Sequence, residues 1–108
     1  MLEQERDADS VLVVPLIVTA QALAGGTRPP DVRAVLRTAR ETPGVDLERT
    51  EQAAWLIRNS GLNDVVDALV ATEALRRVPS IVITSDTDDI RRLVDTDPAG
   101  RRVATWRV

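Results

Sequence analysis

The sequence predicts an α/β fold, with a single domain at residues 1–108 built on a mainly parallel sheet. Short β-branched runs at residues 11–14 and 81–83 are typical of buried strands. Segments with apolar residues at helical spacing lie between these runs, and Gly, Pro and Asn mark the boundaries. Strands that alternate with helices indicate an α/β protein whose strands run mainly parallel. The 108 residues suffice for one domain and are too few for two.

The first part of the chain is expected to contain one strand and two helices. The run at residues 11–14 is followed by Pro15, and proline favours the first position of a helix. That helix is expected at residues 16–24, where a pair of glycines provides a natural C-terminal cap. A second helix is expected at residues 31–40, because its apolar residues follow the helical period.

The middle of the chain predicts a turn, a short strand and a third helix. Thr-Pro-Gly at residues 42–44 is typical of a turn, and residues 45–47 are expected to form the strand. Thr50 is expected to cap the helix at its N-terminus. Gly61 is expected to end it.

The last part of the chain predicts a buried helix that leads into a buried strand. Asn63 or Asp64 is expected to cap a helix at residues 65–77, which is apolar nearly all round. Pro79 ends this helix, and the apolar run at residues 81–83 forms the strand. The remaining elements are expected to be a helix at residues 86–94, a turn at residues 97–100 and a strand at residues 103–108.

Composition narrows the chemistry that the chain can perform. The sequence contains no Cys and no His, which excludes thiolate nucleophiles, imidazole bases and Cys/His zinc sites. A metal ion would have to be a hard cation held by carboxylates, namely Mg²⁺ or Mn²⁺. The net charge of −3 argues against a broadly basic nucleic-acid surface. The longest apolar run, at residues 11–20, is too short to cross a bilayer, so we expect a cytoplasmic protein without a membrane partner.

Four aspartates form the constellation that can carry chemistry. Asp64 and Asp67 are three residues apart at a helix start, and Asp86 follows a strand directly. Asp67 has mostly apolar neighbours, so burying its carboxylate is costly unless it is paired or bound to a metal. Helix capping is the competing interpretation, and on residue chemistry alone it is favoured. Capping explains Asp64 and Asp89 better than it explains Asp67.

The segments "DVVDALVATEA" and "IVITSDTDDIRRL" resemble the last two motifs of the PIN-domain family, and "VLVVPLIVTAQALAGG" resembles the second. This family includes the ribonuclease toxins of bacterial toxin–antitoxin pairs, and the resemblance covers residues 11–108. It implies a three-layer α/β fold and a Mg²⁺ (or Mn²⁺) site. By position, Asp67 and Asp86 would be catalytic metal ligands and Asp64 an accessory ligand. Asp89 would support the helix start.

The chain departs from the family pattern in two places. Gln21 stands where the family has a metal-site Glu, and its amide offers a carbonyl oxygen without charge. The first, central strand with its early Asp is missing, which would leave the strands at residues 11–14 and 81–83 with unpaired edges. The simpler hypothesis is that the recorded start is too far downstream and that residues 1–9 are the tail of the first helix.

The resemblance implies two alternative functions. The first is an endoribonuclease that uses Mg²⁺ to cleave RNA phosphodiesters, forms a homodimer and, if it is a toxin, binds an antitoxin protein. The second is a catalytically inactive PIN-like remnant that acts as a protein-binding module, since two of four acidic positions are lost. A phosphoacceptor signalling domain is a distant third hypothesis, because such a domain pairs its Asp with a Lys and this chain has none.

Three arginine pairs can be considered as contacts for RNA phosphates. The negative net charge favours a solvated surface role instead. The pairs are Arg76-Arg77, Arg91-Arg92 and Arg101-Arg102.

Overall fold

The computed structural model describes residues 13, 14, 18, 24 and 43–108. The chain divides into two units, Met1–Gly44 and Val45–Val108, and the elements with described bounds belong to the second. The elements expected at residues 11–14, 16–24 and 31–40 therefore lie outside the described residues, apart from isolated positions. The second unit is mixed α/β, as predicted, with three α-helices and two parallel strands in its described part.

Helix α3, Leu47–Ser60, begins earlier than the sequence predicted. Asp46 is its N-cap, and the Asp46 carboxylate accepts a hydrogen bond from the Arg49 amide at 2.8 Å. The strand expected at residues 45–47 is therefore wrong, because this cap starts the helix inside that segment. Thr50 does not cap the helix; its hydroxyl donates to the Asp46 carbonyl at 2.7 Å. Gly61 ends the helix as predicted, with a left-handed φ of 79° that favours glycine.

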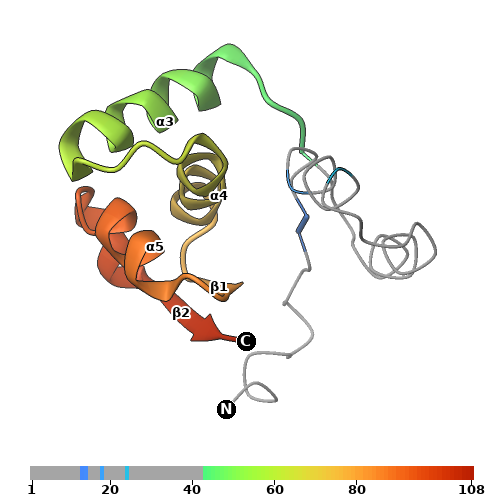
Figure 1. Ribbon diagram of the computed structural model, residues 1–108, viewed down its shortest axis with the longest axis vertical. Helices are drawn as coiled ribbons and strands as arrows, with labels where there is room; N and C mark the ends of the chain where they lie inside the picture. Colours follow the sequence, from blue (N-terminus) through green and yellow to red (C-terminus); the bar gives the residue numbers. More distant parts are fainter. Residues whose placement is uncertain (1–12, 15–17, 19–23, 25–42) are drawn as a thin grey trace. The chain divides into compact units, whose positions relative to one another are not determined.

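Helix α4, Val65–Arg76, lies between α3 and α5 and contributes most to the core (Figure 1). Asp64 caps it, in agreement with one of the two predicted caps. Its small side chains let the neighbouring helices approach closely, and the predicted burial of the helix is confirmed. The buried apolar residues of the unit are Ala53, Leu56, Ala68, Ala71, Ala74, Leu75, Val82, Ile90, Leu93, Val94 and Val103.

The sheet of the described residues consists of strand β1, Ser80–Thr84, and strand β2, Val103–Arg107. The two strands pair in parallel, with Ser80 opposite Val103 and Thr84 opposite Arg107. Helix α5, Thr87–Val94, and the 3-10 helix η1, Pro98–Arg102, connect them. This crossover places the N-terminus of α5 at the carboxyl end of β1, which is where α/β proteins bind their ligands.

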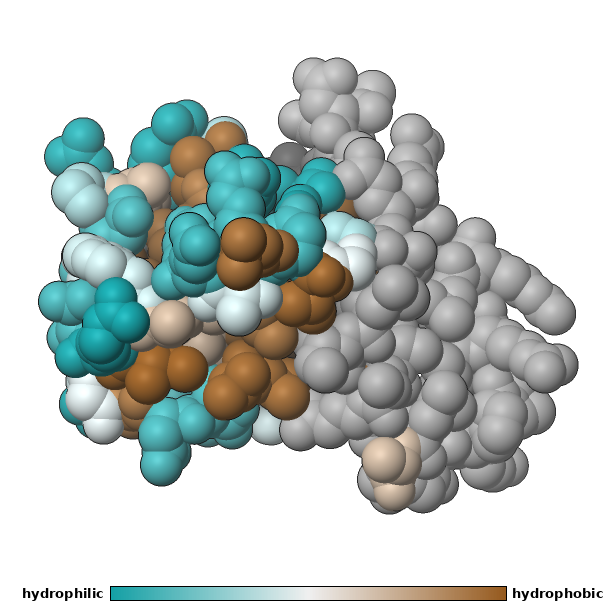
Figure 2. All heavy atoms as spheres, turned by 90° about the horizontal axis from the view of Figure 1, so that it is seen from above, coloured by the Kyte–Doolittle hydropathy of each residue, from teal (hydrophilic) through white to brown (hydrophobic). Residues whose placement is uncertain are grey.

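The surface of the second unit is of mixed character. Figure 2 shows hydrophilic side chains interleaved with apolar ones over the described residues. Ile83 on β1 is one of the large apolar side chains that remain exposed. No helix among the described residues is long and apolar enough to cross a membrane.

Gly100 in η1 lies close to the backbone at the end of α5. A Cβ atom at this position would lie 1.9 Å from the carbonyl oxygen of Val94. Because the obstacle is backbone, no side-chain rotation can relieve it. We expect Gly100→Ala to lower the free energy of unfolding by about 1–3 kcal/mol, measured by urea denaturation. A loss below about 0.5 kcal/mol, the range of ordinary surface changes, would show that the approach is looser than described.

Candidate metal centre

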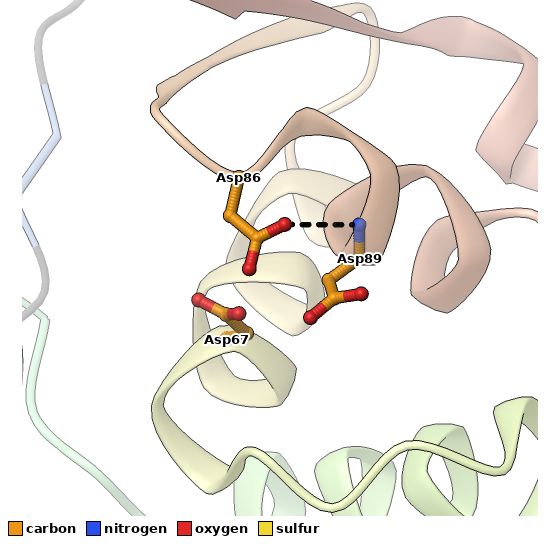
Figure 3. A group of neighbouring side chains, drawn as sticks. All are labelled: Asp67, Asp86 and Asp89. Atoms are coloured by element: carbon orange, nitrogen blue, oxygen red, sulfur yellow. Dashed lines mark hydrogen bonds between the residues drawn. The ribbon is translucent and has the colours of Figure 1, made fainter.

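Three carboxylates converge where the N-termini of α4 and α5 meet. Asp67 lies in the first turn of α4, Asp86 is the N-cap of α5, and Asp89 lies in the first turn of α5. One oxygen from each carboxylate lies within 4.8 Å of the other two (Figure 3). We call Asp67, Asp86 and Asp89 the acidic triad. Its position off the carboxyl end of β1 follows from the strand–helix connection.

Asp86 can cap α5 and belong to the acidic triad at the same time. Its Oδ1 accepts a hydrogen bond from the Asp89 amide at 3.4 Å, while the other oxygen points toward Asp67 (Figure 3). Asp64 has a different role, because its Oδ1 accepts from the Asp67 amide at 3.0 Å and caps α4. The capping interpretation is thus confirmed for Asp64 and Asp86. Asp67 lies in the first turn of α4, where the helix dipole favours a negative charge, but its carboxylate caps no described helix.

Asp67 has the most perturbed carboxyl group of the triad. The pKa of Asp67 is raised to about 6, chiefly by burial and in addition by the negative charges of Asp64, Asp86 and Asp89. Burial and the adjacent Asp86 carboxyl raise the pKa of Asp89 as well, while Arg92 offsets part of that rise. Crowding like charges in this way is unfavourable without a compensating cation.

Arginine does not neutralise the triad in the described part of the chain. The ion pairs of the described residues involve none of its three aspartates. Arg92, whose charge acts on Asp89, donates from Nη2 to the carbonyl of Ser60 at 2.8 Å. The negative charge of the triad is therefore left without an ion-pair partner among these residues.

The donor set fits a hard divalent cation. Carboxylate oxygens are the ligands that Mg²⁺ and Mn²⁺ prefer. Two oxygens on opposite sides of an octahedral Mg²⁺ are about 4.2 Å apart, since each bond is about 2.1 Å long. The 4.8 Å limit of the triad is slightly wider than this. It therefore suits one or two direct carboxylate ligands, with the third reached through water or by a small side-chain rotation.

The structure brings together two of the three aspartates that the sequence assigned to the metal. Asp67 and Asp86 lie in the triad, but the third member is Asp89 where the sequence analysis gave Asp64. Asp89 was expected only to support the helix start. The spacing of Asp86 and Asp89 held the missing signal, because an N-cap and the residue three positions later share one face of a helix. Gln21, the substituted family position, lies outside the described residues.

Several of the paired arginines serve the fold itself. Arg91 donates to the carbonyls of Val103 and Gly100 and pairs with Asp95, so it ties α5 to the crossover. Arg77 pairs with the buried Glu73 at 2.6 Å. Arg91 keeps a side chain that is 36% exposed, as expected of a surface residue, and its guanidinium also bonds the backbone. Arg101 and Arg102 are exposed, in line with that expectation.

No family model, curated protein or solved structure matches this chain.

Proposed function

We propose that the acidic triad binds Mg²⁺ or Mn²⁺ and that the chain is a PIN-type endoribonuclease that hydrolyses RNA phosphodiesters. The observation that carries this proposal is the convergence of Asp67, Asp86 and Asp89 at the carboxyl end of β1. The motifs around Asp67 and Asp86 that resemble the PIN family support the same assignment. An antitoxin protein and a homodimer partner follow from the resemblance and are part of the proposal.

The electrostatics of the triad explain why a cation is required for this chemistry. Three carboxylates repel an RNA phosphate, so most of their negative charge must be offset before a phosphodiester can approach. When bound, a divalent cation would offset that charge, lower the pKa of a coordinated water and stabilise a phosphate oxygen. The residues of the chain hold the ion: Asp86 and Asp89 from α5, and Asp67 from α4. Asp86 can do so while capping α5, because capping uses only one of its oxygens.

Calorimetric titration with Mn²⁺ tests the binding step. We expect saturable binding by the full chain and at least about 10-fold weaker binding by Asp86→Asn. Asn is as good an N-cap as Asp, so this variant keeps α5 capped. Asp88→Asn is the matched control, since Asp88 is exposed in the same turn of α5 and lies outside the triad. Equal binding by wild type and Asp86→Asn would leave the aspartates as helix caps.

Cleavage of single-stranded RNA tests the activity. We expect cleavage that requires Mg²⁺ or Mn²⁺, stops on addition of a chelator, and is lost in Asp86→Asn but kept in Asp88→Asn. Cation binding without any cleavage would reject the nuclease and favour the alternative of an inactive PIN-like module that binds a protein.

A further inference from the structure

The loop that carries Asp86 forms two hydrogen bonds with one side chain of strand β2, that of Arg107. Arg107 is the last residue of β2, and the parallel register places it opposite Thr84, at the end of β1. Its Nη1 donates to the carbonyl of Ser85 at 3.0 Å, and its Nη2 donates to the hydroxyl of Thr87 at 2.7 Å. Ser85 and Thr87 are the two neighbours of Asp86. The guanidinium therefore bonds the residues on both sides of Asp86, which belongs to the acidic triad.

Most other described bonds near this loop are short-range, apart from the one that the Val108 amide donates to the Thr84 carbonyl at 3.2 Å, just before Ser85. The Asp86 amide donates to the Thr84 hydroxyl at 3.0 Å, and the Asp89 amide donates to Asp86 Oδ1 at 3.4 Å. Both join residues no more than three positions apart, and Ser85 and Asp86 are exposed. A cap at 3.4 Å is long for an N–H···O bond, so it restrains the Asp86 side chain only weakly. The two bonds from Arg107, which come from 20 and 22 residues away, join Ser85 and Thr87 themselves to the end of β2.

We propose that Arg107 is a positioning residue, which orients Asp86 so that its carboxylate joins Asp67 and Asp89. This inference rests on the proposed function, since the purpose of the oriented carboxylate is to hold the cation. The guanidinium suits this task because its planar fork bonds two acceptors at once in a fixed geometry. A lysine ammonium is a point charge on a flexible stem and cannot reproduce that geometry.

Charge and positioning predict opposite effects on cation binding. Arg107 is a positive charge bonded to both neighbours of Asp86, so removing it should strengthen cation binding if charge alone mattered. If Arg107 instead orients Asp86, its removal should weaken cation binding, as the loss of residues that orient metal ligands commonly does. The sign of the change therefore decides between the two.

The first measurement is Mn²⁺ affinity by calorimetry on the full chain. We expect Arg107→Met to bind Mn²⁺ about 10-fold more weakly than wild type, and Arg107→Lys to recover only part of that loss. Arg102→Met is the control for loss of an exposed arginine and should bind as wild type does. Thr87→Val removes one of the two acceptors without changing charge, and we expect a smaller loss in the same direction. It also keeps the test valid if Arg107→Met does not fold.

The second measurement needs no metal. The side-chain couplings of Asp86, measured by NMR in the metal-free protein, should indicate one rotamer in wild type and averaging in Arg107→Met or Thr87→Val. Unchanged couplings, or tighter Mn²⁺ binding by Arg107→Met, would overturn the proposal. Unchanged Mn²⁺ affinity with a raised KM for RNA would overturn it too, by assigning Arg107 to the substrate. If wild type binds no Mn²⁺, the proposed function fails, and the couplings still show whether Arg107 orients Asp86.

Discussion

Replacing Asp67 by Asn is expected to abolish tight Mn²⁺ binding and, at the same time, to stabilise the metal-free protein at neutral pH. The binding loss follows because Asn keeps a carbonyl oxygen but gives up the negative charge, and we expect it to reach about 100-fold. The gain in stability follows because the ionised Asp67 carboxylate is half-buried and faces three other carboxylates. A single substitution therefore moves function and stability in opposite directions.

The dependence of this gain on pH has a definite sign. The folded-state pKa of Asp67 is about 6, above its ordinary value of 3.8. The stability associated with the protonated carboxyl is therefore fully present below about pH 4 and is lost as the pH rises through 6. The amide that Asp67→Asn introduces does not titrate, so the variant and wild type should be similar near pH 4 and should differ most above pH 6. Because Asp67 keeps some contact with solvent, we expect a difference on the order of 1 kcal/mol.

Thermal melts at pH 4 and pH 7 check this expectation. A gain of about 1 kcal/mol corresponds to a rise of a few degrees in the melting temperature of a domain of this size. Asp88→Asn, an exposed neighbour in α5, should show little change at either pH. Addition of Mn²⁺ at pH 7 should raise the melting temperature of wild type and leave that of Asp67→Asn unchanged. A variant less stable than wild type at pH 7 would mean that the Asp67 carboxylate makes favourable contacts in the metal-free protein.

Local signals explain which parts of the fold could be predicted. Gly61 as a C-cap and the apolar run of β1 depend on a few adjacent residues and were predicted correctly, and Asp64 was one of the two predicted N-caps of α4. The segment at residues 45–47 failed for a physical reason. A short apolar–polar–apolar alternation fits a strand, but the Asp46 carboxylate accepts a hydrogen bond from the Arg49 amide and starts α3 instead.

Predicting all three members of the acidic triad requires knowledge of the tertiary structure, which sequence periodicity does not contain. The position of Asp86 after a strand and the apolar surroundings of Asp67 were visible in the sequence. The third carboxylate could come from Asp64 of the α4 cap or from Asp89 of α5. The choice depends on how the N-termini of these two helices lie relative to each other in the fold. The role of Arg107 depends on the register of β1 and β2, which fixes the residue opposite Thr84. The spacing of Asp86 and Asp89 indicates that these two share a face of α5, but no short-range pattern gives the residue opposite Thr84.

The buried Glu73 is a second feature that the sequence analysis passed over. It stands in the otherwise apolar middle of α4, and its side chain is only 8% exposed. Oε1 accepts from Arg49 Nε at 2.8 Å and Oε2 accepts from Arg77 Nε at 2.6 Å. Arg49 belongs to α3, so this carboxylate joins the two helices that pack most closely. An acid in the middle of a largely apolar helix was the signal, since a buried charge needs a partner.

Replacing Glu73 by Ala is expected to lower the free energy of unfolding by about 3 kcal/mol, because it removes the buried carboxylate with which both Arg49 and Arg77 form ion pairs. We expect the lower end of the usual range, since Arg49 is 20% exposed and also pairs with Asp46 at 2.7 Å. Glu73→Gln keeps the shape and one acceptor oxygen, so its loss should be smaller. Glu51→Ala, an exposed glutamate of α3, is the control and should change stability by less than about 0.5 kcal/mol.

Urea denaturation at pH 7 and at low pH measures this contribution and its sign. Burial by itself raises the pKa of Glu73, but the hydrogen bonds and charges of Arg49 and Arg77 outweigh burial and hold it below the ordinary value of 4.5. The stability that ionised Glu73 contributes is thus present above pH 4.5 and lost as the pH falls through the lowered value. The gap between wild type and Glu73→Gln should therefore narrow in acid. A constant gap would mean that packing, and not charge, makes Glu73 stabilising.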